Sequence, residues 1–274
     1  MMKKILIISF LIGSLSAMAQ TGINEKLAVP LSSPGERGLL EVNQINGDIY
    51  VEGYNGQEVI IEASFGSHNE EEEREKDRSA PPGMKRIASN PAKITAKEND
   101  NVVSVNTESW KKRTDLTIKI PSNFDLNLHT IHGVIDVKSV DGAMEISGVN
   151  GGVNLDEISG SVVCNTVNGQ VNVRFVKMDD DAPMSFVTLN GNVDVTLPAS
   201  AKVSAKMKSD QGEIYTDFDM EMKSGNNQVK RGRDCDDCNY EITINPWVFG
   251  EINNGGPEFT FKNMNGDILI RKRS

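Results

Sequence analysis

The sequence predicts an all-β protein, a β-solenoid of about ten glycine-marked strand-and-turn units. Three observations support this prediction. A glycine recurs every nine residues through the centre of the chain, from Gly133 to Gly169. Apolar residues stand two and four places after each of these glycines, which is the alternation of a β-strand. Only 5% of the residues are aromatic, a composition that suits thin, repetitive β-structure.

Residues 1–19 have the features of a secretory signal peptide. A short basic start precedes a mostly apolar run of about eleven residues, 5–15, which is too short to span a bilayer. Small residues then occupy the −3 and −1 positions before Gln20, so we expect cleavage between Ala19 and Gln20. We find no second apolar run of about 18 residues and expect no membrane span after the signal is removed.

The rest of the chain is predicted to contain a leader, residues 20–37, and one β-strand-repeat domain, residues 38–274. Two polar insertions, at 66–92 and 224–239, interrupt the repeats. The first includes a charged run followed by prolines, residues 68–86, in which no apolar period survives. Such a composition indicates a solvated loop that connects strands, or an acidic arm that binds a partner.

The repeat is easiest to see in rows of nine residues. Position 1 of each row is Ile or Val, position 2 is polar and position 3 is glycine. Glycine adopts positive φ without a Cβ clash, and Asn or Asp before it tolerates a left-handed conformation, so each row is one strand and one tight turn. The predicted turn glycines are Gly47, Gly133, Gly142, Gly151, Gly160, Gly169, Gly191, Gly212 and Gly266.

Positions 5 and 7 of each row share one face of the strand and are predicted to form the core. Two rows per coil would give about 18 residues per coil and two facing sheets. Cys164 occupies position 7, between Leu155 and Val173 in the pattern, and is expected to be a buried small hydrophobe. Replacing Leu155 by Asp should break the stack, whereas the same change at the outward Asn154 should be nearly silent.

An antiparallel meander or sandwich is the alternative, because each Asn-Gly pair could also be a two-residue hairpin turn. The solenoid explains why like residues recur at a fixed step, whereas a meander needs only alternation. The step loosens to 22 residues after Gly169 and to 21 after Gly191, so longer turns or extra strands are expected there. Residues 116–128 and 195–205 follow another rule, in which a strand, a proline, a bend and a second strand precede the next unit.

The net charge is −10, and it becomes −12 when Lys3 and Lys4 leave with the signal. Nucleic acids and anionic lipid surfaces attract basic patches, so neither is expected as the main partner.

The sequence predicts no catalytic, cofactor-binding or metal-ligating residues. Cys235 and Cys238 form a C-x-x-C, which in an exported protein we interpret as a disulfide that closes a small loop. A zinc site would need about four ligands and has no second pair nearby, and a redox site would need a βαβ setting; both remain weaker alternatives. His68, His129 and His132 are expected on the surface.

Carboxylates are plentiful but scattered, and we expect them on solvated strand faces. The outward acids of the repeats are Asp136, Glu145, Asp156 and Asp194. The calcium-binding nine-residue repeat needs a second glycine two places after the first, and the rows have Ile, Met or Val there, so no calcium ladder is expected.

Several phrases of the sequence resemble a known family. "INGDIYV", "IHGVIDV", "VNGQVNV", "LNGNVDV" and "MNGDILI" are similar to units of an exported bacterial β-strand-repeat family whose members are labelled as adhesins and whose function is unknown. The resemblance covers roughly residues 38–274. It implies an exported solenoid, in the periplasm or at the cell surface, and supplies no catalytic residues.

The favoured hypothesis is therefore a non-enzymatic, exported β-solenoid that acts as an adhesin-like or envelope scaffold and binding module. Its partner would be an unknown envelope protein or a glycan, bound by an outward strand face or an insertion loop. One alternative is an enzyme acting on polysaccharide with outward carboxylates as acid and base. The other is an envelope signalling partner that binds through the acidic loop 68–86.

Overall fold

The structure of the chain is a computed structural model. It describes residues 23–65, 94–107, 113–223 and 247–273. The predicted signal peptide with its cleavage site, the insertions at 66–92 and 224–239, the acidic loop and the Cys235–Cys238 pair lie outside these ranges and stay predictions.

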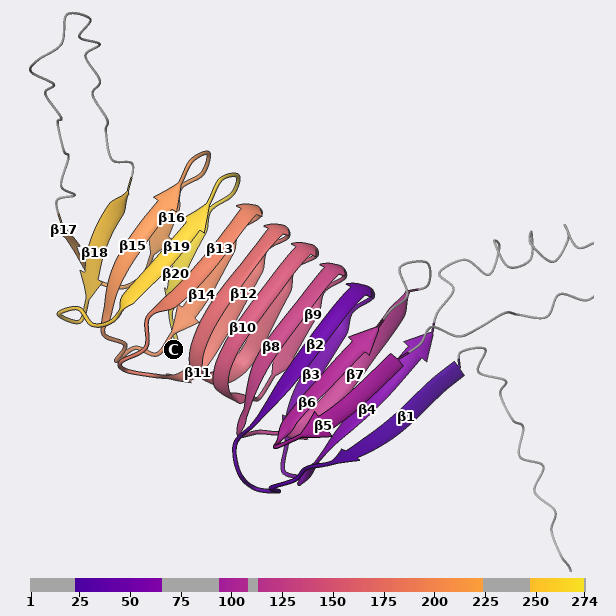
Figure 1. The fold of residues 1–274 in the computed structure, drawn as a ribbon. Coiled ribbons are helices and arrows are strands. Elements are labelled where there is room, and N and C mark those ends of the chain that lie inside the picture. Colours follow the sequence, from indigo (N-terminus) through magenta and orange to yellow (C-terminus); the bar gives the residue numbers. More distant parts are fainter. Residues whose placement is uncertain (1–22, 66–93, 108–112, 224–246, 274) are drawn as a thin grey trace, which may run out of the picture.

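The described residues form two stacks of β-strands that face each other, here called sheet I and sheet II (Figure 1). Sheet I contains, in spatial order, β5 (Ile94–Asn99), β6 (Val102–Thr107), β2 (Gly38–Asn46), β8 (Phe124–His132), β10 (Asp141–Asn150), β11 (Val153–Asn168), β13 (Met184–Asn190), β19 (Glu258–Asn263), β15 (Val203–Ser209), β18 (Val248–Ile252) and β17 (Met220–Lys223). Sheet II contains β1 (Ile23–Pro30), β4 (Glu58–Phe65), β7 (Thr114–Pro121), β3 (Ile49–Tyr54), β9 (Ile135–Lys138), the first part of β11, β12 (Val171–Met178), β14 (Val193–Leu197), β20 (Ile268–Lys272) and β16 (Ile214–Thr216). The long strand β11 belongs to both sheets.

The central strands pair in parallel with the register that two nine-residue rows per coil require. Met144 lies beside Val162 in sheet I, and Val153 lies beside Val171 in sheet II, each pair 18 residues apart in sequence. Like positions of successive coils therefore stack on one another. The fold is a β-solenoid, as predicted, and the antiparallel meander is wrong for the central stack.

Antiparallel pairing is confined to the two ends of the stack. At one end β1 pairs with β4, β4 with β7 and β5 with β6; at the other end β18 pairs with both β15 and β17. The far end of sheet II differs, because its last described strand, β16, pairs in parallel with β20. Residues 23–30 fall within the predicted leader, yet they form β1, so the strand domain of the structure extends to residues before 38.

The order of the coils in space differs from their order in the sequence. The unit that contains Ile49 stacks directly against that of Ile135, although 86 residues separate them. At the other end, Ile268 lies between Val193 and Ile214, so the last unit of the chain is inserted between two earlier ones. The loosened spacing after Gly169 and Gly191 has another cause: longer connections, at 179–183 between β12 and β13 and at 198–202 between β14 and β15.

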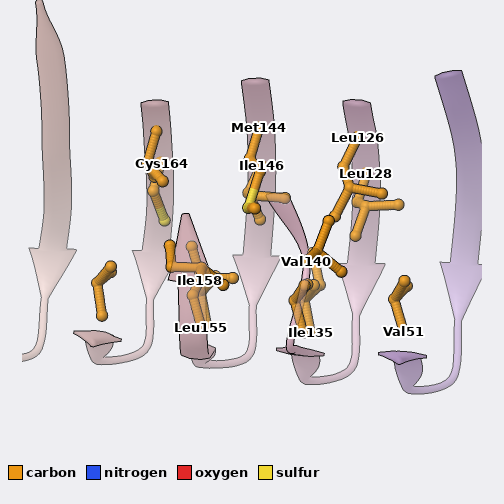
Figure 2. Close-up of a cluster of buried hydrophobic side chains, with 14 of the residues drawn as sticks. Val51, Leu126, Leu128, Ile135, Val140, Met144, Ile146, Leu155, Ile158 and Cys164 are labelled. Atoms are coloured by element: carbon orange, nitrogen blue, oxygen red, sulfur yellow. The ribbon is translucent and has the colours of Figure 1, made fainter. Parts of the chain in front are cut away.

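The core fills the space between the sheets (Figure 2). Figure 2 shows Leu126, Met144 and Ile146 of sheet I directed toward Ile135 and Leu155 of sheet II. Cys164 is fully buried, as predicted, but its stacking neighbours are Ile146 and Phe186 rather than Leu155 and Val173. Because each coil contains two rows, position 7 of alternate rows belongs to opposite sheets.

The predicted turn glycines stack in two columns at the corners of the coil. One column contains Gly47, Gly133, Gly151, Gly169, Gly191, Gly266 and Gly212, and the other contains Gly142 and Gly160. A Cβ added to Gly151 would lie 1.8 Å from the carbonyl oxygen of Gly133. Gly133 has a φ of 146°, but Gly151 has no left-handed φ. The close approach of successive coils, rather than the turn conformation alone, therefore requires glycine.

Candidate functional site

The outward face of sheet II carries a ladder of polar side chains at one position of the repeat. Parallel coils place equivalent residues about 4.8 Å apart, so a column of identical charges would repel itself. Amides separate the acids here. The Asn154 Nδ2 donates to Asp136 Oδ1 at 2.6 Å, and the Asn172 Nδ2 donates to Asn154 Oδ1 at 2.8 Å. The ladder gives this face a fixed arrangement of side chains.

The next outward column of sheet II alternates in charge. Lys119 Nζ lies 3.1 Å from Glu52 Oε2. On the next two coils, Lys138 lies in register beside Glu52, and Asp156 lies in register beside Lys138. Arg174 Nη1 then lies 3.3 Å from Asp156 Oδ1. Opposite charges on successive coils offset one another, so these five residues together carry a net charge of only +1.

A third ladder follows the glycine corner. Asn168 Nδ2 donates to Asn150 Oδ1 at 2.9 Å, Asn190 Nδ2 to Asn168 Oδ1 at 2.7 Å, and Asn265 Nδ2 to Asn190 Oδ1 at 2.6 Å. His132 Nδ1 lies 3.2 Å from Asn150 Nδ2 at the start of this column. These amides bond mainly to one another, which indicates a structural role for the Asn-Gly pairs.

A groove of about 320 Å³ crosses the outward face of sheet II over β3, β7, β9 and β11. Its polar lining consists of Tyr50, Glu52, Thr117, Asp136, Lys138, Asn154 and Asp156. Tyr50 is 39% exposed, and its hydroxyl donates to Asp48 Oδ2 at 3.1 Å. Partial burial, reinforced by the charge of Asp48, raises the pKa of Tyr50, so the phenol stays a neutral donor.

The outward acids predicted from the sequence face solvent, but only two of them share this groove. Asp136 and Asp156 line it, whereas Asp194 lies two coils beyond Asn154 and is bound by Arg271 Nε at 2.8 Å. Glu145 belongs to β10 of sheet I and is exposed there.

A second concavity, here called the hollow, lies on the outward face of sheet I near the end of the stack that holds β1 and β5. It has a volume of about 600 Å³. Its polar lining includes Asn43, Thr95, Lys97, Asn106 and His129, and its aliphatic lining is Ile45 and Ile131.

The remaining candidate residues do not form a reactive cluster. Burial raises the pKa of the Cys164 thiol to about 12, so this cysteine is unreactive in the folded protein. His129 lines the hollow and His132 belongs to the corner ladder. Within the described ranges, no group of three or more His, Cys, Asp and Glu residues could hold a metal ion. The same part of the chain has no helix with the length and apolar character to cross a membrane.

Sequence reasoning did not single out Tyr50, Glu52, Thr117 or Lys138. Strand alternation places each of these side chains on the outward face, so the repeat pattern predicts their direction. The groove itself depends on the contact between β3 and β9, which are far apart in the sequence.

Two solved structures are similar to the chain at low identity. One is a proposed cell adhesion protein from Clostridium sporogenes, with 10% identity, a TM-score of 0.43, and coverage of 92% of this chain and 100% of its own. The other is a proposed adhesin from Bacteroides fragilis, with 12% identity, a TM-score of 0.40, and coverage of 93% and 98%. No curated protein matches the chain.

A family model described as Toastrack DUF4097 matches residues 15–245, which is most of the chain. The match confirms the resemblance to a β-strand-repeat family that the glycine-marked phrases suggested. Together with the parallel stack and its glycine columns, it shows that the chain belongs to the Toastrack DUF4097 family.

Proposed function

We propose that the chain is a non-enzymatic, exported binding module of the cell envelope that holds a glycan against the outward face of sheet II. The groove on that face carries the proposal. It combines a half-exposed aromatic ring, Tyr50, with hydroxyl, amide and carboxylate groups at fixed intervals. Hydroxyl groups of a sugar would pair with these groups, and the tyrosine ring would contact its C–H face.

The bonding of the groove acids supports binding rather than catalysis. Asp136 accepts the amide of Asn154, Glu52 pairs with Lys119, and Asp156 lies beside Arg174. A general acid or base needs a carboxyl group that can exchange its proton with the substrate. Each of the three carboxylates therefore already has a polar or charged partner on the protein.

The test is a glycan array probed with the mature chain, followed by titration of the best ligand. Tyr50→Ala should weaken binding about tenfold through loss of the ring contact, and Tyr50→Phe should retain most of the affinity. Tyr215→Ala is the matched control, because Tyr215 occupies the same outward column at the far end of the sheet and is 54% exposed. Equal affinity in Tyr50→Ala and wild type, or cleavage of the bound glycan, would refute the proposal.

A further inference from the structure

The hollow of sheet I lies on the opposite wall of the solenoid from the groove and is built by four different strands. Asn106 of β6, Asn43 of β2 and His129 of β8 are direct neighbours in register, and Thr95 of β5 lies beside Asn106. These side chains therefore lie side by side on neighbouring strands, in a line that crosses the sheet. Lys97 lies two residues along β5 from Thr95 and lines the same hollow.

Four polar side chains of the hollow lack a hydrogen-bond partner in the described part of the chain, whereas Gln44, which also lines it, donates from Nε2 to the Thr114 carbonyl oxygen at 2.6 Å. Among the described residues, the side chains of Asn43, Lys97, Asn106 and His129 make no hydrogen bond or ion pair with one another or with any neighbour. This contrasts with the groove and the corner ladder, in which each amide and carboxylate has a partner. Hydrogen-bond donors that line the same concavity and do not bond to one another are free to bind a ligand.

The charge of the hollow also differs from that of the whole protein. Of the residues that the structure describes, Lys97 lines it and no carboxylate does, in a chain with a net charge of −10. The nearest acids along these strands bond elsewhere. Glu41 Oε2 accepts the hydroxyl of Ser104 at 2.7 Å, and Glu98 Oε1 accepts the backbone amides of Ser32 and Asn101 at 2.9 and 3.0 Å. The single cationic group of the described lining, Lys97, thus favours a negative ligand.

We propose that the hollow is a binding site for a small oxyanion, the carboxylate or phosphate group of an envelope ligand. Lys97 supplies the charge, and the amides of Asn43 and Asn106 with the hydroxyl of Thr95 donate to the oxygens. Neighbouring strands are about 4.8 Å apart, a spacing at which donors from two strands reach two oxygens of one group. This inference is independent of the proposed glycan site, because the two sites share no residue.

The test uses the mature chain and two probes, inorganic phosphate and D-glucuronate, titrated separately and followed by amide chemical shifts in NMR spectra. Lys97→Gln should weaken binding about tenfold, because a charged donor is lost. Asn43→Ala keeps the charge and should weaken binding severalfold. Lys262→Gln is the matched control: Lys262 is exposed on the same face, in the row of Asn43 and His129 but several coils away.

Shifts of hollow residues by either probe, reduced in Lys97→Gln and unchanged in Lys262→Gln, support the site. The stronger probe identifies whether the natural group is a phosphate or a carboxylate. Binding should also weaken as salt is added, because an exposed charge pair is screened. Absence of shifts in wild type with both probes, or equal losses in the two lysine variants, overturns the proposal. Thermal unfolding of each variant verifies that the fold is retained.

Discussion

Replacing Gly151 by Ala tests whether the close approach of successive coils holds the solenoid together. The added Cβ would lie 1.8 Å from the Gly133 carbonyl oxygen, whereas ordinary contacts begin near 3.4 Å, so the two corners must separate by about 1.6 Å. Three hydrogen bonds at this corner cannot survive such a movement. They are Gly133 N–H to Asn150 O, Gly151 N–H to Asn168 O and Thr166 Oγ1 to Gly151 O, each 3.0 Å long.

At about 1 kcal/mol for each bond, Gly151→Ala should lower the free energy of unfolding by about 3 kcal/mol. For a domain of this size that loss corresponds to a fall in Tm of about 6–12 °C. The measurement is thermal and urea unfolding followed by far-ultraviolet circular dichroism.

The control is Gly152→Ala at the next residue. Its added Cβ would meet its nearest atom, the Gln170 carbonyl oxygen, at 3.3 Å, so a shift of a few tenths of an ångström suffices. The smaller entropy of the unfolded chain offsets this cost, and we expect a change below about 1 kcal/mol. Equal stability of the two variants would show that the glycine columns are not required by coil spacing and would refute the reasoning.

Three further predictions follow from the packing. Leu155→Asp places an unpaired charge in a site that is 1% exposed and should abolish cooperative unfolding in urea; a variant that unfolds like wild type would contradict the core assignment. Asn154→Asp replaces an amide that donates to Asp136 by a second carboxylate, so it should cost about 1 kcal/mol near pH 7, and protonation should remove this deficit near pH 4. The sequence alone predicted that Asn154→Asp would be nearly silent, and the hydrogen bond to Asp136 changes that expectation. Equal stability of Asn154→Asp and wild type at both pH values would contradict the new prediction. Cys164 should resist iodoacetamide up to about pH 9 in the native protein and react in denaturant, as read by mass spectrometry of its peptide; rapid native labelling would show that the core opens locally.

If both proposals hold, sheet II binds a glycan and sheet I binds an oxyanion, so the two sheets of one module have different ligands. The groove presents side chains that the ladders already hold in place, so a ligand binds there with little ordering of the protein. The hollow presents uncommitted donors and depends on charge, so its affinity should vary with salt while that of the groove should not.

The sequence by itself determined the unit of this fold. The glycine in each corner and the two apolar positions after it are visible within a single nine-residue row, and the nine-residue step is visible from one row to the next. Strand alternation then decides which side chains point inward, so the core residues Val153 and Leu155 could be predicted and are buried. The outward direction of Asp136 and Asp156 follows from the same rule.

Only the tertiary structure decided which units are neighbours. All units follow one pattern, so backbone pairing cannot tell them apart, and the entropy cost of closing a loop rises slowly with its length. The coil of Ile49 therefore stacks on that of Ile135 across 86 residues, and that of Ile268 enters between Val193 and Ile214. The groove and the hollow are made by such contacts. They depend on the order of the coils in space, which no single row of the sequence contains.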